Sequence, residues 1–116
     1  MQMVKGKITI ADLNKMSKNM FDGLVKAVVD IKKEMLIVDA QMHADEEKEL
    51  LEQGSKQEDL WWINLYPEKY NTVDFIEFDS MINLRPWQNN RSRGVDDPKI
   101  QKQIIKIINQ LVTKWT

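Results

Sequence analysis

Apolar residues recur along the chain with two periodicities. One predicts strands and the other predicts helices. Four segments are short and rich in β-branched or aromatic residues, which is typical of strands. They are residues 24–31, 35–40, 59–66 and 75–83. The first two are expected to form a hairpin, because only Lys32, Lys33 and Glu34 separate them. In the last segment, alternation places Ile76, Phe78, Ser80 and Ile82 on one face, and Phe75, Glu77, Asp79 and Met81 on the other.

Two further segments carry the signals of helices. Residues 9–21 begin with Thr9 and Asp12, which have the spacing of a capping box. Residues 43–54 have a run of acidic residues in the expected first turn, where the helix dipole favours negative charge. Gly54 is a natural residue to end that helix.

A third helix is predicted at the C-terminal end of the sequence. Asp97 is a suitable N-cap, and Pro98 suits the first helical position. The apolar residues that follow recur every three to four positions and form one stripe. They are Ile100, Ile104, Ile107, Ile108, Leu111, Val112 and Trp115.

These elements follow one another in the order α-β-β-α-β-β-α and predict a single α+β domain over residues 1–116. Two hairpins joined through a helix favour a four-stranded, mostly antiparallel sheet with helices packed on it. The helix between segments 35–40 and 59–66 leaves a mixed sheet open, because a crossover of this kind can make two strands parallel neighbours.

The composition is that of an ordinary globular protein, with 42% hydrophobic and 30% charged residues. The net charge of −1 disfavours a dedicated nucleic-acid-binding protein, which carries a large basic excess. The absence of cysteine excludes disulfides and thiol chemistry, and no segment has the apolar length of a membrane span. A cytoplasmic location, no membrane association and no cofactor are therefore expected. Trp61 and Trp62 point to opposite faces of their strand, so one needs additional cover, which leaves a homo-oligomer open.

The strongest chemical signal is a loop that contains every arginine of the chain. Arg85, Arg91 and Arg93 lie within residues 83–98, where none of the 14 lysines falls. Arginine presents a planar fork of donors that fits carboxylates and phosphates, which lysine does not. Long loops on a rigid scaffold are often functional. Residues 83–94 are therefore the candidate site for an anionic group, and Gly94 allows close backbone approach or a positive φ.

Two interpretations of this loop remain open. In the structural one, the arginines pair with the protein's own carboxylates, and loop asparagines such as Asn90 satisfy backbone groups. In the functional one, Arg85, Asn90, Arg91 and Arg93 bind a ligand together with Glu77 and Asp79. Trp87 is a candidate to stack on an arginine or on a nucleobase.

Acidic residues beside the loop suggest an enzyme as an alternative. Glu77 and Asp79 are two positions apart, and such pairs bind Mg²⁺ or act as acid and base. His43 and Glu47 have a spacing that would share a helical face, but this is a weak metal candidate, since the chain has no second histidine. No metal site is expected.

Several long motifs resemble those of a family of small prokaryotic proteins known only as a domain of unknown function. The motifs are HADEE, GSKQEDLWWINLYP and FIEFDSMINLRPWQNNRSRGVDDP, and with VKAVVDI they span most of the chain. The resemblance implies no established activity, substrate or cofactor. It implies shared roles for the matching positions His43, Asp45, Glu46, Glu58, Asp59, Glu77, Asp79, Arg85, Asn90, Arg91 and Arg93.

The sequence thus favours a binding module for a small anionic ligand or an acidic partner at residues 83–94. One alternative is an enzyme that acts on a phosphorylated or nucleotide substrate through a carboxylate-bound divalent metal. The other is a protein-interaction domain.

Overall fold

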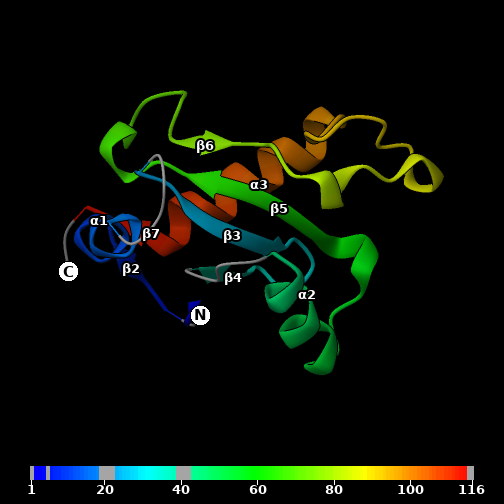
Figure 1. The fold of residues 1–116 in the computed structure, drawn as a ribbon, viewed down its shortest axis with the longest axis horizontal. Coiled ribbons are helices and arrows are strands. Elements are labelled where there is room, and N and C mark those ends of the chain that lie inside the picture. Colours follow the sequence, from blue (N-terminus) through cyan, green and yellow to red (C-terminus); the bar gives the residue numbers. More distant parts are fainter. Residues whose placement is uncertain (1, 5, 19–22, 39–42, 115–116) are drawn as a thin grey trace.

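The computed structural model describes residues 2–4, 6–18, 23–38 and 43–114 (Figure 1). Five strands form one sheet in the spatial order β1-β4-β3-β5-β6, and every neighbouring pair is antiparallel. The strands are β1 (Gln2–Val4), β3 (Val25–Asp30), β4 (Met35–Val38), β5 (Leu60–Leu65) and β6 (Ile76–Glu77). A separate parallel pair joins β2 (Ile8–Thr9) to β7 (Val112–Thr113).

In the part of the chain that the structure describes, three α-helices accompany the sheet: α1 (Ile10–Ser17), α2 (His43–Glu52) and α3 (Pro98–Leu111). The α+β class and the antiparallel sheet predicted from the sequence are confirmed. Strands β4 and β5, which α2 connects, run in the same direction. They are not neighbours, because β3 lies between them. The helix caps are also as predicted. Thr9 and Asp12 form both bonds of a capping box, and the Asp97 side chain accepts from the backbone N–H of Lys99 at 2.9 Å.

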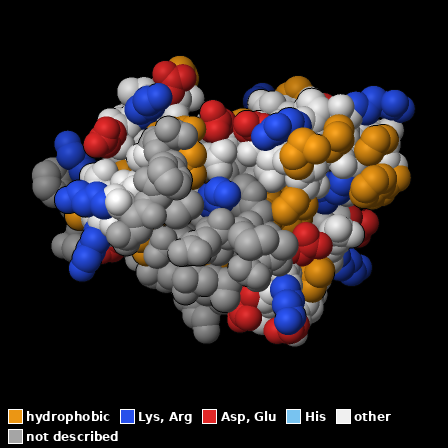
Figure 2. Space-filling model, viewed as in Figure 1, with side chains coloured by type: hydrophobic (Ala, Val, Ile, Leu, Met, Phe, Trp, Pro, Cys, Tyr) orange, Lys and Arg blue, Asp and Glu red, His pale blue; other side chains and the backbone are white. Residues whose placement is uncertain are grey.

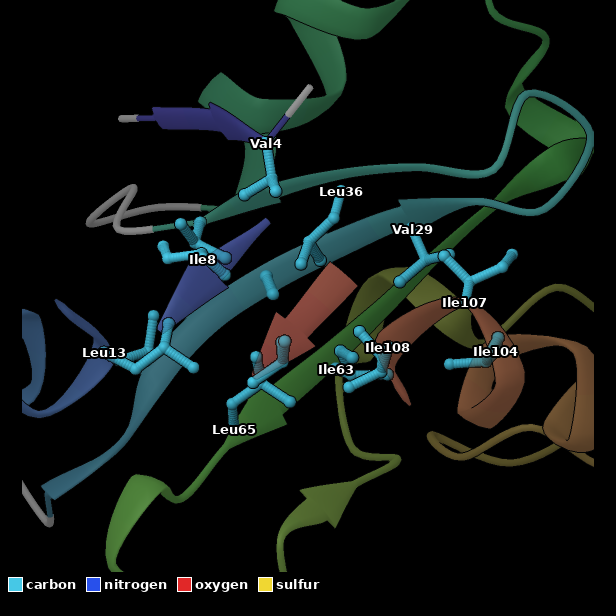
Figure 3. Packing of buried hydrophobic residues seen from close by; sticks show 14 of the residues in the cluster. Val4, Ile8, Leu13, Val29, Leu36, Ile63, Leu65, Ile104, Ile107 and Ile108 are labelled. Carbon is cyan, nitrogen blue, oxygen red and sulfur yellow. The ribbon is translucent and has the colours of Figure 1, made fainter. Parts of the chain in front are cut away.

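The main hydrophobic core lies between the sheet and α3. Ile104, Ile107 and Ile108 of α3 are buried against side chains from one face of the strands, as Figure 3 shows. Alternation sends Trp61 and Trp62 to opposite faces, and both are fully buried. Trp61 belongs to the main core, whereas Trp62 belongs to a second cluster on the other face.

The second cluster contains Val28, Ile37, Leu50, Leu60 and Trp62, with Met35 and Ile82 packed against it. Leu50 comes from α2, so this helix and the segment that contains Ile82 cover the second face of the sheet. The additional cover that the two tryptophans require is therefore supplied from within the chain.

The fourth predicted strand is much shorter than expected. Of residues 75–83, only Ile76 and Glu77 pair with β5, and the chain then bends into the 3₁₀ turn η4 (Met81–Asn83). The hydroxyl of Ser80 caps this turn by accepting from the backbone N–H of Ile82. The predicted alternation consequently fails: Ile76 and Phe78 pack on the main core, whereas Ile82 packs on the second cluster.

Candidate functional site

Because β6 ends after Glu77, one edge of β5 is incompletely paired. β3 pairs with β5 from Leu60 to Leu65, whereas β6 pairs only with Asn64 and Leu65. Backbone groups of Leu60 and Trp62 that face away from β3 need other partners, because buried unpaired backbone groups are costly. Side chains of residues 83 and 85 provide these partners.

The Asn83 side chain takes the place of a strand's peptide group beside Trp62. Its Oδ1 accepts from the backbone N–H of Trp62 at 3.0 Å, and its Nδ2 donates to the carbonyl of Trp62 at 2.8 Å. The same Nδ2 donates to the carbonyl of Arg93 at 3.1 Å. Asn83 is fully buried. A buried primary amide thus continues the hydrogen bonding of the sheet after β6 has ended.

Arg85 continues this role one step further along the same edge. Its Nη1 donates to the carbonyl of Gln57 at 2.8 Å and its Nη2 to the carbonyl of Leu60 at 2.9 Å. The guanidinium carbon lies 4.2 Å from the centre of the Trp61 ring and 5.5 Å from that of Trp62. The cation is therefore held by backbone carbonyl dipoles and by the negative faces of two aromatic rings.

Burial determines the electrostatics of Arg85. Desolvation lowers the pKa of its guanidinium, and the negative charge of Glu47 raises it in partial compensation. An arginine nonetheless stays protonated at neutral pH, because its ordinary pKa lies far above neutrality. This placement supports the structural interpretation of Arg85, although its acceptors are carbonyls and not the carboxylates that the sequence suggested.

Asn90 ties the second half of the loop together. Its Nδ2 donates to the carbonyls of Asn83 at 2.7 Å, Gly94 at 2.8 Å and Ser92 at 3.2 Å. Its Oδ1 accepts from the backbone N–H of Asp96 at 2.8 Å. Asn90 is buried like Asn83, so the loop is closed around an amide that uses both of its ends.

The backbone of the loop is fixed as well. Arg85 and Asn90 form an isolated antiparallel bridge around the 3₁₀ turn η5 (Pro86–Gln88), with Asn89 in the left-handed region at a φ of 60°. At Gly94 the backbone approaches Phe78 closely, and an added Cβ would lie 3.0 Å from the Phe78 carbonyl oxygen. Of the two reasons that the sequence offered for this glycine, close backbone approach is the one observed.

The other two arginines lie at the surface. The Nε of Arg93 is 2.7 Å from Oδ1 of Asp79, with the two side chains 56% and 44% exposed. Exposed ion pairs of this kind contribute little to stability. Arg91 is exposed, and its guanidinium forms no hydrogen bond or ion pair with the residues that the structure describes. Arg91 is thus the one arginine whose cation faces solvent without a described partner.

The carboxylates beside the loop have separate roles. Glu77 accepts from Nδ2 of Asn64 at 2.8 Å and from the hydroxyl of Tyr66 at 3.2 Å, whereas Asp79 pairs with Arg93. Within the described part of the chain, no three histidine or acidic side chains are grouped as metal ligands. The side chain of His43 lies outside the described residues.

Asp96 stabilises the end of the loop through its carboxylate. One oxygen accepts from the hydroxyl of Ser92 and the other from the backbone N–H of Arg91 at 2.6 Å. These hydrogen bonds, the one from Ser92 foremost, lower the pKa of Asp96, because they favour the charged form.

Three large apolar side chains of residues 81–87 are exposed. Met81 is 62% exposed, Leu84 is 38% exposed and Trp87 is 77% exposed. Hydrophobic side chains gather on this end of the molecule, where the 81–88 segment lies (Figures 1 and 2). Met81 and Trp87 belong to two separate 3₁₀ turns, and Leu84 is the extended residue that ends the first of them. In the sequence they are apolar residues at intervals of three, a signal that neither the strand predicted over residues 75–83 nor the stacking predicted for Trp87 takes into account.

A shallow hollow of about 560 Å³ lies beside Trp87. Lys56, Gln57, Glu58, Trp87 and Gln88 line it. The side chain of Gln88 donates to the carbonyl of Glu58 at 2.7 Å, which connects the arginine loop to the 3₁₀ turn η2 (Gln57–Asp59).

The fold and the loop together define an α+β protein in which buried Asn and Arg side chains complete one sheet edge. The family model for proteins of unknown function DUF5674 matches residues 2–111, so the chain belongs to that family. No match was found among the curated proteins or among the solved structures.

The described helices include none with both the length and the apolar character needed to cross a membrane. The cytoplasmic location expected from the sequence stays a prediction.

Proposed function

We propose that this chain is a protein-binding module whose partner docks on the outward side of residues 81–91. The observation that carries the proposal is the inverted arrangement of this segment. It buries polar Asn83, Arg85 and Asn90 and exposes apolar Met81, Leu84 and Trp87. Isolated exposed apolar residues are ordinary, but several on one segment suggest a contact surface. Tryptophan and methionine are also enriched at interfaces.

The backbone that carries Met81, Leu84 and Trp87 is held in place by buried hydrogen bonds, which favours binding. Hydrogen bonds from Asn83, Arg85 and Asn90 fix the backbone that carries them. A surface held in its bound conformation loses less entropy on association than a flexible loop does. The buried polar residues thus form a rigid base for the exposed apolar ones.

Arg91 supplies the polar part of the proposed contact. Its guanidinium is exposed, and a carboxylate of the partner would satisfy its donors in a fork geometry. This keeps the acidic partner expected from the sequence. Binding of a small anion is less favoured. The donors of Arg85 and Asn90 are directed inward, and Arg93 already pairs with Asp79.

No specific contact in the described residues favours the metal-dependent enzyme. Glu77 and Asp79 are hydrogen-bonded to different groups, and neither belongs to a set of three potential ligands. The proposal therefore combines the binding module with the protein-interaction domain and does not assign a reaction.

Photo-crosslinking from position 87 tests this function. With a photoreactive aromatic amino acid in place of Trp87, irradiation in cells that express the protein should give a discrete adduct. Met81→Ser and Arg91→Gln should each reduce the yield severalfold, because each removes one side chain of the proposed contact and a loss of about 1 kcal/mol weakens binding about fivefold.

The matched control places the same photoreactive residue at Val73, which is 95% exposed on a different loop. It should give no comparable adduct. Equal adducts from positions 73 and 87, or a yield that neither Met81→Ser nor Arg91→Gln changes, would contradict the proposal.

A further inference from the structure

We infer that the partner of this surface is a second copy of the same chain, bound about a twofold axis beside Trp87. This inference rests on the proposed function and names its partner. A twofold contact uses the same patch on both molecules, so the patch must be complementary to itself. The surface around Trp87 meets this requirement in shape and in charge.

The shape requirement is met by a protrusion next to a hollow. Trp87 is 77% exposed and also forms one wall of the hollow of about 560 Å³. A twofold axis at this wall brings the Trp87 ring of each copy over the hollow of the other. The two rings then lie near the axis, where aromatic pairs favour an offset or edge-to-face arrangement.

The charge requirement is met on the lining of the same hollow. Lys56 and Glu58 both line it, both are exposed, and they carry opposite charges two positions apart. The twofold axis places Lys56 of one copy near Glu58 of the other, and the reverse contact follows by symmetry. Two copies also repel each other little, because each chain has a net charge of −1.

A second hollow in the protein lacks this complementarity and provides a contrast. It lies between residues 70–78 and α3, has a volume of about 380 Å³, and is lined by uncharged residues alone. Val73 on its border is 95% exposed and also lines a smaller hollow of about 220 Å³ that contains Lys69, Asp74 and Glu77. Val73 therefore controls for the exposure of an apolar side chain outside the proposed contact, and not for neighbouring charge.

Sedimentation equilibrium of the whole chain tests the inference. Over about 1–500 µM protein, a monomer–dimer equilibrium is expected, because a contact made by a small patch of residues gives weak association. Trp87→Ala should raise the dissociation constant roughly 30-fold, as truncation of a central hot-spot residue does. Val73→Ala should leave it unchanged.

A charge exchange distinguishes the twofold arrangement from nonspecific association. Lys56→Glu and Glu58→Lys should each weaken the dimer, because each places like charges across the axis. The double variant K56E/E58K should restore it.

A wild-type chain that stays monomeric throughout this range, or a dimer that Trp87→Ala does not weaken, would overturn the inference. A double variant no tighter than the two single ones would overturn the twofold arrangement. If the chain is monomeric but position 87 still gives a Met81-dependent adduct with a different protein, this inference fails and the proposed function stands. If that adduct is absent as well, both fail.

Discussion

Arg85→Ala is expected to lower the free energy of unfolding by about 3–5 kcal/mol, as loss of a large buried side chain does. The substitution leaves the carbonyls of Gln57 and Leu60 without their donors and empties the space beside Trp61 and Trp62. The buried carbonyl of Leu60, left unpaired, costs about 1–3 kcal/mol, whereas the part-buried carbonyl of Gln57 costs less. Removing a desolvated cation returns part of this loss, but it restores neither the hydrogen bonds nor the packing. Urea denaturation followed by circular dichroism measures the change.

Two variants show which property of Arg85 is responsible. Arg85→Met retains much of the volume but not the donors, so it should recover only part of the stability lost in Arg85→Ala. Arg91→Ala removes an exposed guanidinium from the same loop and should change the free energy of unfolding by about 0.5 kcal/mol or less. A loss below about 1 kcal/mol for Arg85→Ala would show that the sheet edge does not depend on this side chain.

Asn83→Asp should destabilise the protein by about 3–4 kcal/mol, although it exchanges only an amide nitrogen for an oxygen. The buried Nδ2 donates to the carbonyls of Trp62 and Arg93. An ionised carboxylate has no donor and would place negative charge against both acceptors. Thermal and urea unfolding at neutral pH measure the loss.

The chain supplies a matched control for this substitution. Asn89→Asp makes the same chemical change six residues later, at an exposed position with a φ of 60°. Aspartate tolerates the left-handed conformation nearly as well as asparagine does, so this variant should be close to neutral. Equal losses for Asn83→Asp and Asn89→Asp would mean that the inserted charge, and not the lost donor, determines the effect.

The parts of the fold that depend on local signals could be predicted from the sequence. The capping box of Thr9 and Asp12, the Asp97 cap and the stripe of α3 each depend on residues a few positions apart. The three long strands could be predicted for the same reason, because their apolar runs match burial on both faces. The two-residue strands β2 and β7 are too short to carry a pattern.

The structure of the loop depends on contacts between residues distant in the sequence, which a local pattern does not encode. Arginine in place of lysine was a real signal, since Arg85 uses both arms of its fork. Its acceptors are carbonyls 25 and 28 residues away, and carbonyls leave no trace in side-chain identity. The alternation of residues 75–83 also resembles a strand, although side chains replace the backbone along most of this edge. The exposed apolar residues were missed because the loop was interpreted through its charges.

The central claim is that Met81, Leu84 and Trp87 serve a partner and not the fold. The free energy of unfolding of the triple serine variant M81S/L84S/W87S tests it most directly, measured at a dilution where the wild-type chain is monomeric. A total change of no more than about 1.5 kcal/mol is expected, as for exposed positions. A loss of about 3 kcal/mol or more would show that these side chains belong to the core and would contradict their assignment to a partner.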